Sequence, residues 1–286
     1  MPVAVVIATR NRRESLLHTL DRLAELPDDV ETIVVDNRSS DGTPAAVARR
    51  HPGVRVLSAG RNRGAAARTL GARATDAETV AFSDDDSWWA PGALTCAAGL
   101  LDRHRRVGLV AARVLVEPEG RLDPTCTAMA HSPLPVDSAL PGPRILGFVA
   151  CGTVVRRTAF LDCDGFEERL GVGGEETLLA IDMAAVGWEL VYVDDVVAHH
   201  MPAPSSERAS RDRRVLRNRL WIEWLRRPRA SAARGTVRLV AGTDRSAWPG
   251  VGAALRGLPW ILRERRPVGR ELDAWIERLE AATAVE

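Results

Sequence analysis

Short apolar runs alternate with segments of helical character through the first 83 residues, and this alternation constrains the fold more than any other feature. Residues 3–8 are apolar without interruption, as expected of a strand that is buried on both faces. Three further strands are predicted at residues 31–36, 54–57 and 79–83. Helices are predicted between them at residues 15–26, from the turn at 41–44 onward, and at 64–73. Strands that alternate with helices predict an α/β fold with a mainly parallel sheet in a three-layer sandwich.

The rest of the chain is less regular up to residue 204 and changes character after it. We expect a strand at 107–116, a long loop at 118–143, an extended segment at 145–156, a helix at 175–186 and a strand at 190–193. From Ser205 onward arginine and tryptophan become frequent, and a helix is predicted at 208–229. One face of that helix carries Leu216, Leu220, Trp221, Trp224 and Leu225. We place a boundary near Pro204, between a domain at 1–204 and a helical extension at 205–286.

No lysine occurs among the 286 residues, and all 39 basic residues are arginine. The absence of lysine excludes a phosphate loop of the GxxxxGK[ST] type, a Schiff-base lysine and a Ser-Lys dyad. The net charge is +1, so the chain is not a polycation of the kind that binds nucleic acid nonspecifically. We therefore expect no nucleic-acid partner.

The cysteines and the beginning of the sequence both point to a cytoplasmic protein. Cys96, Cys126, Cys151 and Cys163 show no CxxC spacing, which predicts reduced thiols in or near the core. The sequence starts directly on an apolar run without a basic segment before it, so we expect no signal peptide. No apolar stretch approaches the length of about 20 residues that crosses a bilayer.

Three consecutive aspartates, Asp84, Asp85 and Asp86, directly follow the apolar run at 79–83. In an open α/β sheet, the loops at the carboxyl ends of the strands are where ligands bind. Three adjacent carboxylates repel one another, and a hard cation such as Mg2+ or Mn2+ would offset that repulsion. A solvated acidic turn is the alternative, but the position after a buried strand favours a metal site.

Several short motifs follow one another along the chain. They are residues 6–12 (VIATRNR), 33–43 (IVVDNRSSDGT), 62–64 (NRG), 67–68 (AR), the three aspartates, and 174–176 (GEE). Their order and spacing closely resemble glycosyltransferase family 2, whose members have the GT-A fold. The resemblance spans about residues 3–200. Each motif is weak alone, whereas the ordered set is specific.

The resemblance implies a Rossmann-like GT-A domain whose nucleotide-sugar half is about 1–115 and whose acceptor half is about 116–204. It implies a metal-dependent, inverting transfer of a sugar from a UDP- or dTDP-sugar to an acceptor hydroxyl. Such a reaction would serve polysaccharide, glycolipid or natural-product glycosylation, with a lipid-linked or a small acceptor. Two other functions stay open: a sugar-1-phosphate nucleotidyltransferase, and a nucleotide-sugar-binding protein without catalysis.

The resemblance also implies roles for individual residues on the donor side. Thr9 and Asn11 would lie against the base and ribose, and Asp36 would accept a hydrogen bond from a uracil or thymine ring N–H. Arg68 would approach the phosphates, and Asp84 the ribose. The full set of implied nucleotide-sugar-binding residues is Thr9, Arg10, Asn11, Asp36, Asn62, Arg68, Asp84 and Asp85.

For the metal, Mn2+ or Mg2+, the resemblance implies Asp86 as the direct ligand, with Asp84 beside it. His199 follows an apolar run and would complete the site through its imidazole, a ligand that suits Mn2+ better than Mg2+. His200 is the alternative histidine. Each histidine taken alone would more often have a structural role.

Inverting transfer needs a general base that takes the proton of the acceptor hydroxyl. The resemblance assigns this role to Glu176 at the start of a predicted helix, with Glu175 beside it. The family often has aspartate at this position, a second aspartate where this chain has Leu178, and arginine where it has Asp182. The choice between Glu175 and Glu176 therefore stays open.

The arginine-rich helix predicted at 208–229 has two interpretations. It either contacts an anionic membrane, where a lipid-linked acceptor would lie, or packs its tryptophan face on the catalytic domain. Acidic residues interleaved with the arginines favour packing. A cytoplasmic location, with peripheral contact at the inner face of the membrane as the alternative, is consistent with both.

Overall fold

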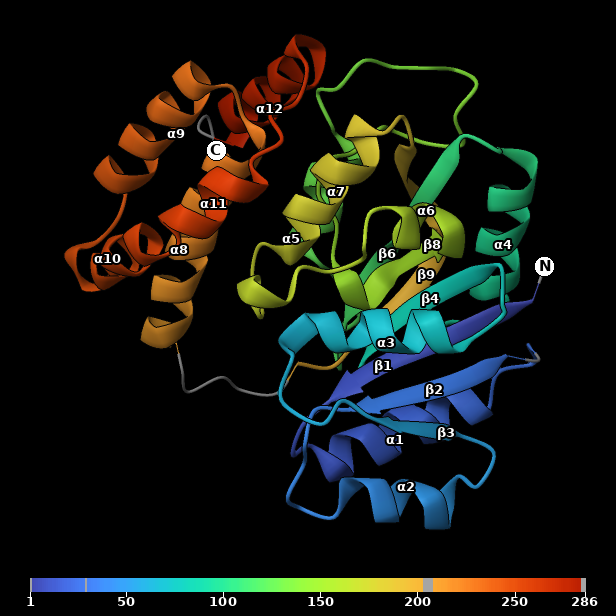
Figure 1. Cartoon of the computed structure of the whole chain (residues 1–286). Coiled ribbons are helices and arrows are strands. Elements are labelled where there is room, and N and C mark those ends of the chain that lie inside the picture. Colours follow the sequence, from blue (N-terminus) through green and yellow to red (C-terminus); the bar gives the residue numbers. More distant parts are fainter. Residues whose placement is uncertain (1, 29, 203–207, 284–286) are drawn as a thin grey trace.

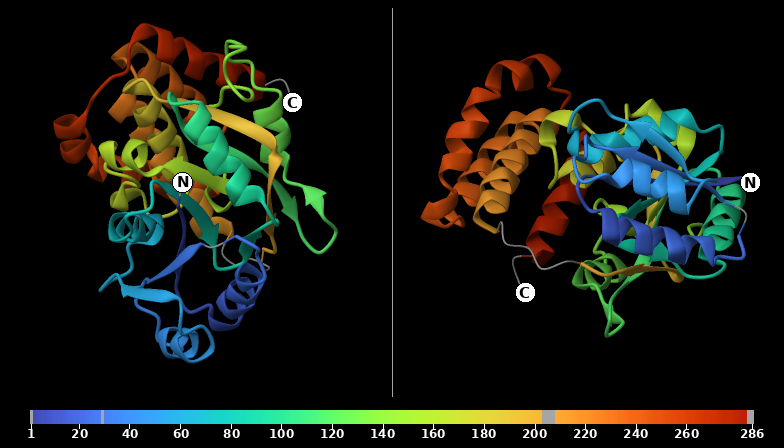
Figure 2. Two further views of the ribbon diagram at one scale, coloured as in Figure 1. Left: turned by 90° about the vertical axis from the view of Figure 1, so that its right-hand side faces the viewer. Right: turned by 90° about the horizontal axis from the view of Figure 1, so that it is seen from below.

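A computed structural model of the chain describes residues 2–28, 30–202 and 208–283. Its centre is a nine-stranded mixed sheet with helices on both faces, and further helices lie beside it (Figure 1). Figure 2 shows, in the view from below, that the C-terminal helices form a group to one side of the sheet. Within the described residues, no helix is long and apolar enough to cross a membrane.

The first four predicted strands form the parallel part of the sheet, in the order β3-β2-β1-β4. They are β1 (Val3–Thr9), β2 (Glu31–Asp36), β3 (Arg55–Ser58) and β4 (Thr79–Asp84). The helices between them are α1 (Arg13–Ala24), α2 (Thr43–Arg50) and α3 (Ala67–Ala74), the last preceded by the 3-10 turn η1 (Gly64–Ala66). In this register Thr9 pairs with Asp36 and Ala8 with Asp84, so the motifs that end these strands meet at one edge.

Beyond β4 the sheet becomes mixed. The added strands are β5 (Ser87–Trp89), β6 (Val107–Val116), β8 (Thr153–Arg156) and β9 (Glu189–His200), with β7 (Arg121–Leu122) paired to β6. β8 runs antiparallel between β4 and β6, and β9 runs parallel to β6. The short β5, which follows the aspartates, pairs with the end of β9 so that Ser87 lies opposite His200. This pairing brings the histidines of β9 to the aspartate turn.

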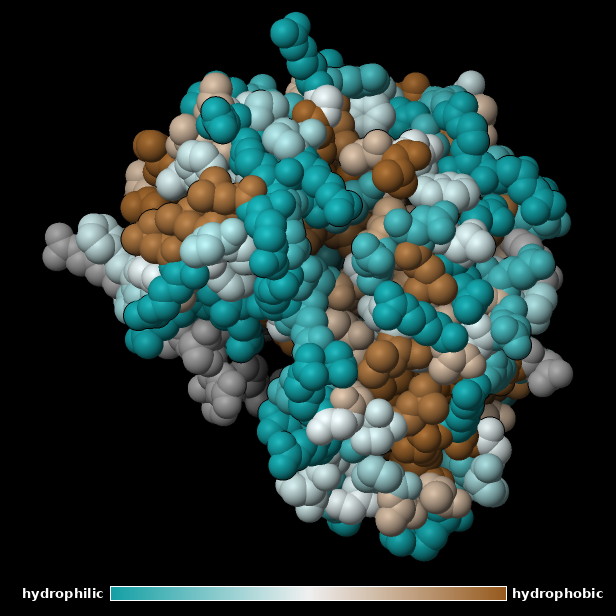
Figure 3. All heavy atoms as spheres, in the orientation of Figure 1, coloured by the Kyte–Doolittle hydropathy of each residue, from teal (hydrophilic) through white to brown (hydrophobic). Residues whose placement is uncertain are grey.

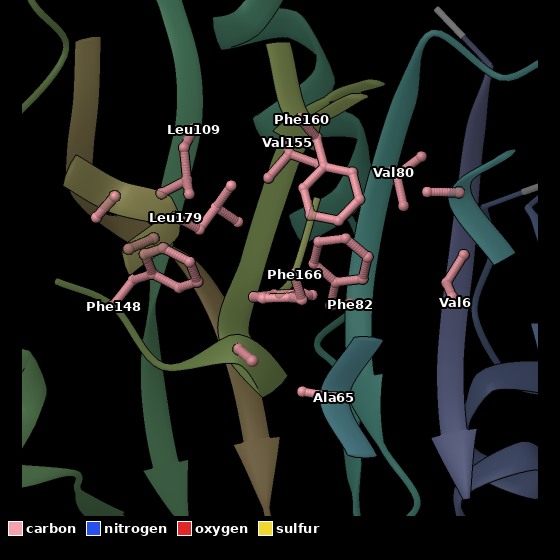
Figure 4. Close-up of a cluster of buried hydrophobic side chains, with 14 of the residues drawn as sticks. Val6, Ala65, Val80, Phe82, Leu109, Phe148, Val155, Phe160, Phe166 and Leu179 are labelled. Carbon is pink, nitrogen blue, oxygen red and sulfur yellow. The ribbon is translucent and has the colours of Figure 1, made fainter. Parts of the chain in front are cut away.

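Two apolar layers pack against the two faces of the sheet, as the sandwich prediction requires. One layer lies under α3, α6 (Arg157–Asp162) and α7 (Glu175–Ala185), and contains Phe82, Phe160 and Phe166 (Figure 4). The ring centroids of these three residues are 5.1 to 5.6 Å apart. The other layer lies under α1, α2 and α4 (Ala93–Arg103). The predicted three-layer α/β architecture is confirmed.

The helical extension begins with α8 (Arg208–Arg226), which packs against α7. The remaining helices are α9 (Arg229–Ala241), α10 (Pro249–Arg256), α11 (Leu258–Glu264) and α12 (Arg270–Thr283), with the 3-10 turn η4 (Arg245–Ala247) before α10. Leu216, Leu220 and Leu225 are buried in one cluster with Leu178 and Ile181 of α7. The interpretation of this helix as a packing element is therefore confirmed. The boundary predicted near Pro204, with Ser205, falls outside the described residues.

The prediction was wrong in the middle of the chain. The segment 118–143 contains β7 and α5 (Pro124–Ala130), and 145–156 contains the 3-10 turn η2 (Ala150–Gly152) before β8. The start signal of α5 was present, because Asp123 caps the helix by accepting a hydrogen bond from the Thr125 N–H at 2.8 Å. Ile145 and Phe148 are buried as an irregular segment, which their apolar pattern does not distinguish from a strand. The short β5, α4, α6 and η3 (Glu168–Leu170) were not predicted.

Candidate active site

The aspartate turn between β4 and β5 is fixed by the start of α1. Arg12 places its Nε 2.8 Å from Asp85 Oδ1 and its Nη2 2.5 Å from Asp86 Oδ2, so one guanidinium spans two carboxylates. The hydroxyls of Ser15 and Thr19 donate hydrogen bonds to the Asp85 carbonyl oxygen, at 2.8 and 3.1 Å. The positive charge of Arg12, shared between these two carboxylates, reduces their repulsion in a buried turn.

Asp85, the middle one of the three aspartates, is hydrogen-bonded to the end of β1. Its Oδ2 accepts a hydrogen bond from the Thr9 hydroxyl at 2.8 Å, and both residues are buried. Burial raises the pKa of Asp85 to about 6, although Arg12 and the Thr9 hydroxyl act in the opposite direction. Thr9 and Asp85, both predicted to touch the nucleotide, thus contact each other in this structure.

Arg68 of α3 reaches the outer side of the same turn. Its Nη2 forms an ion pair with Asp84, and the residue is only 8% exposed. Its Nε is buried and has no hydrogen-bond partner among the described residues. The same guanidinium interacts electrostatically with Glu175 and Glu176, so Arg68 lies between the aspartate turn and the start of α7.

Three side chains from distant parts of the chain could hold a metal ion. One ligand atom each from Asp84, Cys151 and His200 lies within 4.8 Å of the others. His200 Nε2 is also 3.4 Å from Asp86 Oδ1. Burial would lower the pKa of His200, but the adjacent Asp86 carboxylate raises it above its ordinary value. A region that stabilises positive charge in this way suits a cation.

The two neighbouring histidines of β9 point to opposite faces of the sheet, because successive side chains alternate along a strand. His199 Nδ1 lies 2.7 Å from Glu117 Oε1, and its ring stacks on Trp88 with centroids 5.6 Å apart. His199 therefore does not lie with the aspartates. His200, which the sequence left as the alternative, is the histidine that lies beside the aspartates, and which of the two binds a metal stays a prediction.

Three glycines in the left-handed region precede the acidic pair at the start of α7: Gly171, Gly173 and Gly174, with φ of 72, 101 and 99°. Their loop turns back so that the Glu175 carboxylate accepts a hydrogen bond from the Gly173 N–H. Glu175 is 2% exposed, whereas Glu176 is partly exposed. Burial, together with the neighbouring carboxylate of Glu175, raises the pKa of Glu176 to about 8. Burial also raises the pKa of Glu175.

The loop at 61–64 is joined to the glycine loop before α7. Ala65 N–H donates to the Gly171 carbonyl oxygen at 3.0 Å, and the guanidinium groups of Arg61 and Arg63 each lie 2.8 Å from Glu168. Asn62, predicted to bind the nucleotide sugar, accepts a hydrogen bond from the Gly64 N–H at 3.0 Å and so shapes this turn. Two motifs more than a hundred residues apart thus form one rim of the site.

The ends of β1 and β2 continue this rim, because the Asn37 side chain donates to the Gly64 carbonyl oxygen at 3.1 Å and accepts from the Arg63 N–H at 3.0 Å. Asp36 accepts hydrogen bonds from the Ser39 N–H at 3.1 and 3.2 Å. Asn11, at φ 53°, accepts from the Ser40 N–H at 2.7 Å. Arg10 is exposed next to them. In this structure Asp36 and Asn11 shape the turn after β2, and their contacts with a nucleotide stay a prediction.

Other residues of the site were not singled out from the sequence. Arg12 lies within the first motif, so its place next to Asn11 was a usable signal. Cys151 carries no sequence signal for this role, because the position of η2 in the packed fold brings it to Asp84 and His200. Glu117, which follows β6, contacts His199 and not the aspartates. The pair Arg217-Asn218 was noticed without an assigned role, and Asn218 binds the glycine loop through the Gly173 carbonyl oxygen.

Known proteins resemble this chain in both sequence and fold. The sequence model of glycosyl transferase family 2 matches residues 4–163. The N-acetylglucosaminyl-diphospho-decaprenol L-rhamnosyltransferase of Mycobacterium tuberculosis is 30% identical over 239 residues, which cover 72% of this chain and 77% of the relative.

Among solved structures, residues 1–349 of S. aureus TarS in complex with UDP-GlcNAc superpose with a TM-score of 0.65 at 17% identity, covering 99% of this chain and 88% of that one. A mannosyltransferase, PcManGT from Pyrobaculum calidifontis, in complex with GDP-Man and Mn2+, gives a TM-score of 0.60 at 19% identity, covering 99% and 86%. These likenesses confirm the predicted GT-A fold.

Proposed function

We propose, from the premise that this chain belongs to glycosyl transferase family 2, that it transfers a sugar from a UDP- or dTDP-sugar to a lipid-linked acceptor with a divalent cation. The chain is a nucleotide-sugar-dependent glycosyltransferase, and the cation, the donor, the base and the acceptor are the proposed parts. The observation that carries the proposal is the cluster of Asp84, Cys151 and His200 at the carboxyl edge of the parallel strands, with Asp86 Oδ1 3.4 Å from His200 Nε2.

The residues at this edge fit a divalent cation. Asp84, Asp85, Asp86, Glu175 and Glu176 bring five carboxyl groups to a region where Arg12 and Arg68 are the arginines that contact them. Carboxylate oxygens and an imidazole suit Mn2+, and Mg2+ accepts the oxygens. We assign Asp84, Asp86 and His200 as ligands. A cation bound there would offset the charge of the departing nucleoside diphosphate.

On the donor side, Asp36 would accept a hydrogen bond from the pyrimidine ring N–H. Its carboxylate receives one N–H donor, from Ser39, and therefore keeps free lone pairs for a second donor. Within the described part of the chain the buried Nε of Arg68 has no acceptor, and a phosphate oxygen would satisfy it. Thr9, Arg10, Asn11 and Asn62 would shape the rims on which the nucleotide lies.

On the acceptor side, Glu176 is the proposed base and Glu175 the residue that positions it. Glu175 is buried and fixed by the Gly173 N–H, whereas Glu176 is partly exposed at the start of α7. Glu176 takes the proton of the acceptor hydroxyl while the oxygen attacks the anomeric carbon. The bond to the diphosphate breaks on the opposite side, which inverts the configuration.

The acceptor class follows from the mycobacterial relative, whose name specifies a diphospho-decaprenol-linked N-acetylglucosamine. We propose a polyprenyl-diphosphate-linked sugar for this chain, used at the cytoplasmic face of a membrane. The test is release of nucleoside diphosphate from UDP- and dTDP-sugars, with Mn2+ or Mg2+, in the presence and absence of a short-chain polyprenyl-diphosphate sugar. Release that depends on both the cation and the acceptor, and that fails in Glu176→Gln, supports the proposal. Activity without a cation, or only with a soluble acceptor, would contradict it.

A further inference from the structure

Large apolar side chains form an exposed row along α10 and α11. Trp248 is 54% exposed, Leu255 59%, Leu258 37% and Leu262 67%. Their spacing of seven, three and four residues places them on one side of a helical path. The path continues from α10 into α11 because Gly257, between them, has helical backbone angles of φ −82 and ψ −9°. We call Trp248, Leu255, Leu258 and Leu262 the apolar row.

The inward side of the same two helices is built from smaller residues. Gly250 and Gly257 lie so close to α8 that a Cβ would meet the Arg213 carbonyl oxygen at 2.5 Å and the Trp221 ring at 2.5 Å. Ala254 and Ile261 are buried on this side. A helix of a protein surrounded by water places its largest apolar residues inward. In α10 and α11, by contrast, Leu255, Leu258 and Leu262 are exposed.

Further apolar surface adjoins the row. Val237 of α9 is 70% exposed, and together with Val240 and Trp248 it lines an open hollow of about 530 Å³. Figure 3 shows apolar residues gathered on the left of the molecule, over the C-terminal helices. A contiguous apolar patch that is rimmed by polar residues marks a surface for a protein or a membrane.

Within the row itself the charges are positive, with Asp244 before it and Glu264 after it. From Arg245 to Arg263 the sequence contains three arginines and neither aspartate nor glutamate. Arg256 lies between Leu255 and Gly257 and has no ion pair among the described residues. Arg263 pairs with Glu264 at 3.0 Å, so a two-fold dimer through this surface would leave Arg256 as the arginine to be matched by a partner's acid. Lipid phosphates would pair with these arginines, and exposed leucine and tryptophan next to arginine is the composition of interfacial helices.

The row also lies close to the glycine loop at 171–174, which precedes α7. Gly250 of α10 packs on Arg213 of α8, and the next residue, Arg214, donates from Nε to the Val172 carbonyl oxygen at 2.9 Å. Val172 belongs to the glycine loop that precedes Glu175. One helix, α8, therefore separates the apolar row from the loop that carries the proposed base.

We propose that the apolar row of α10 and α11, with Arg256 and Arg263, is the surface by which this enzyme docks on an anionic membrane. The leucines and Trp248 enter the boundary between head groups and acyl chains, and the arginines lie at the phosphates. This inference rests on the proposed lipid-linked acceptor, because docking would bring the acceptor head group to the mouth of the site. It differs from the arginine-rich helix considered from the sequence, whose apolar face is buried against α7.

The test is co-sedimentation of the full chain with vesicles of phosphatidylcholine, with and without phosphatidylglycerol. We expect binding to anionic vesicles that weakens as salt rises. Leu255→Glu/Leu262→Glu should weaken it by about tenfold or more, because two exposed apolar side chains no longer enter the interface. Arg256→Gln/Arg263→Gln should weaken it by about fivefold for each arginine. The matched control is Val136→Glu/Val186→Glu, which changes two exposed valines away from the row and should bind as the unaltered chain does.

Titration of each variant with dTDP and UDP in the absence of vesicles separates this inference from the proposed function. Retained nucleotide binding with lost vesicle binding supports docking through the row. Equal vesicle binding by the Leu255→Glu/Leu262→Glu variant and the unaltered chain would overturn it, as would the absence of vesicle binding at low salt. Sedimentation velocity that shows a dimer, dissociated by the leucine changes, would assign the row to a second copy instead. Vesicle binding by a chain that binds neither nucleotide would overturn the donor proposal alone.

Discussion

The side-chain amide of Asn218 donates a hydrogen bond to the Gly173 carbonyl oxygen at 2.5 Å, across 45 residues of sequence. The same amide donates to the Leu170 carbonyl oxygen at 2.8 Å, and Asn218 is fully buried. The glycine loop has left-handed backbone angles and few side chains of its own, so it depends on such external donors for its shape. The extension thereby fixes the conformation of the loop that delivers Glu175 and Glu176.

Asn218→Ala should therefore lower both stability and turnover. The Gly173 carbonyl oxygen loses its donor, whereas the Leu170 carbonyl oxygen keeps Arg217 Nη2 at 3.1 Å. We expect a cost of about 1–3 kcal/mol in the free energy of unfolding, which lowers Tm by several degrees. Turnover should fall while the affinity for nucleoside diphosphate stays near normal, because Asn218 does not face the donor side. Arg214→Gln is the matched control, since Arg214 donates to the Val172 carbonyl oxygen of the same loop from an exposed position. Equal effects of the two changes, by thermal unfolding and kinetics, would argue against this role.

The proposed metal site includes His200 and not its neighbour His199, so substitutions of the two histidines should differ in their effect on Mn2+ binding. His200→Ala and Asp86→Asn should each weaken Mn2+ binding and the metal-dependent part of nucleoside-diphosphate binding by tenfold or more, because each removes one ligand. His199→Ala is the control: its imidazole contacts Glu117 and Trp88, so Mn2+ binding should persist. Electron paramagnetic resonance of free Mn2+ and calorimetric titration measure these affinities. Loss of Mn2+ binding in His199→Ala with retention in His200→Ala would restore the assignment made from the sequence.

These histidines also show where sequence reasoning reaches its limit. Asp84 could be placed at a strand end because an apolar run and its polar end are local features of the sequence. The choice between His199 and His200 depends on the register of β9, where a shift of one residue exchanges the two faces of the sheet. Cys151 joins the site through η2, whose position is set by packing. Likewise, α5 was hidden in a proline-rich segment, although the Asp123 cap could have indicated it.

The donor base should be a pyrimidine. Asp36 lies at the end of β2 and is 6% exposed. Adenine has no ring N–H to offer it and would leave a desolvated acceptor, and guanine carries its ring N–H farther from the glycosidic bond than a pyrimidine does. UDP and dTDP should bind more tightly than ADP and GDP, by about tenfold. Asp36→Asn should reduce this preference, although the change also weakens the turn that Asp36 forms with Ser39. Competition titrations that rank ADP or GDP above both pyrimidine nucleotides would contradict the role of Asp36.

If Glu176 is the base, the activity should rise with pH. Glu176 acts as a base only when it is deprotonated, and burial with the adjacent Glu175 raises its pKa to about 8. The value of kcat/KM should therefore rise about tenfold per pH unit below this pKa and level off above it. Glu176→Gln keeps the shape but cannot accept a proton, so turnover should fall by about 10²–10⁴-fold and the rise with pH should disappear.

Glu175→Gln is the comparison: it removes a carboxylate that the Gly173 N–H fixes, and it should lower turnover less while keeping a pH-dependent rate. Without the charge of Glu175, the pKa of Glu176 should fall, which shifts the rise to lower pH. A dead Glu175→Gln beside an active Glu176→Gln would exchange the two roles, and near-normal turnover in both would place the base elsewhere.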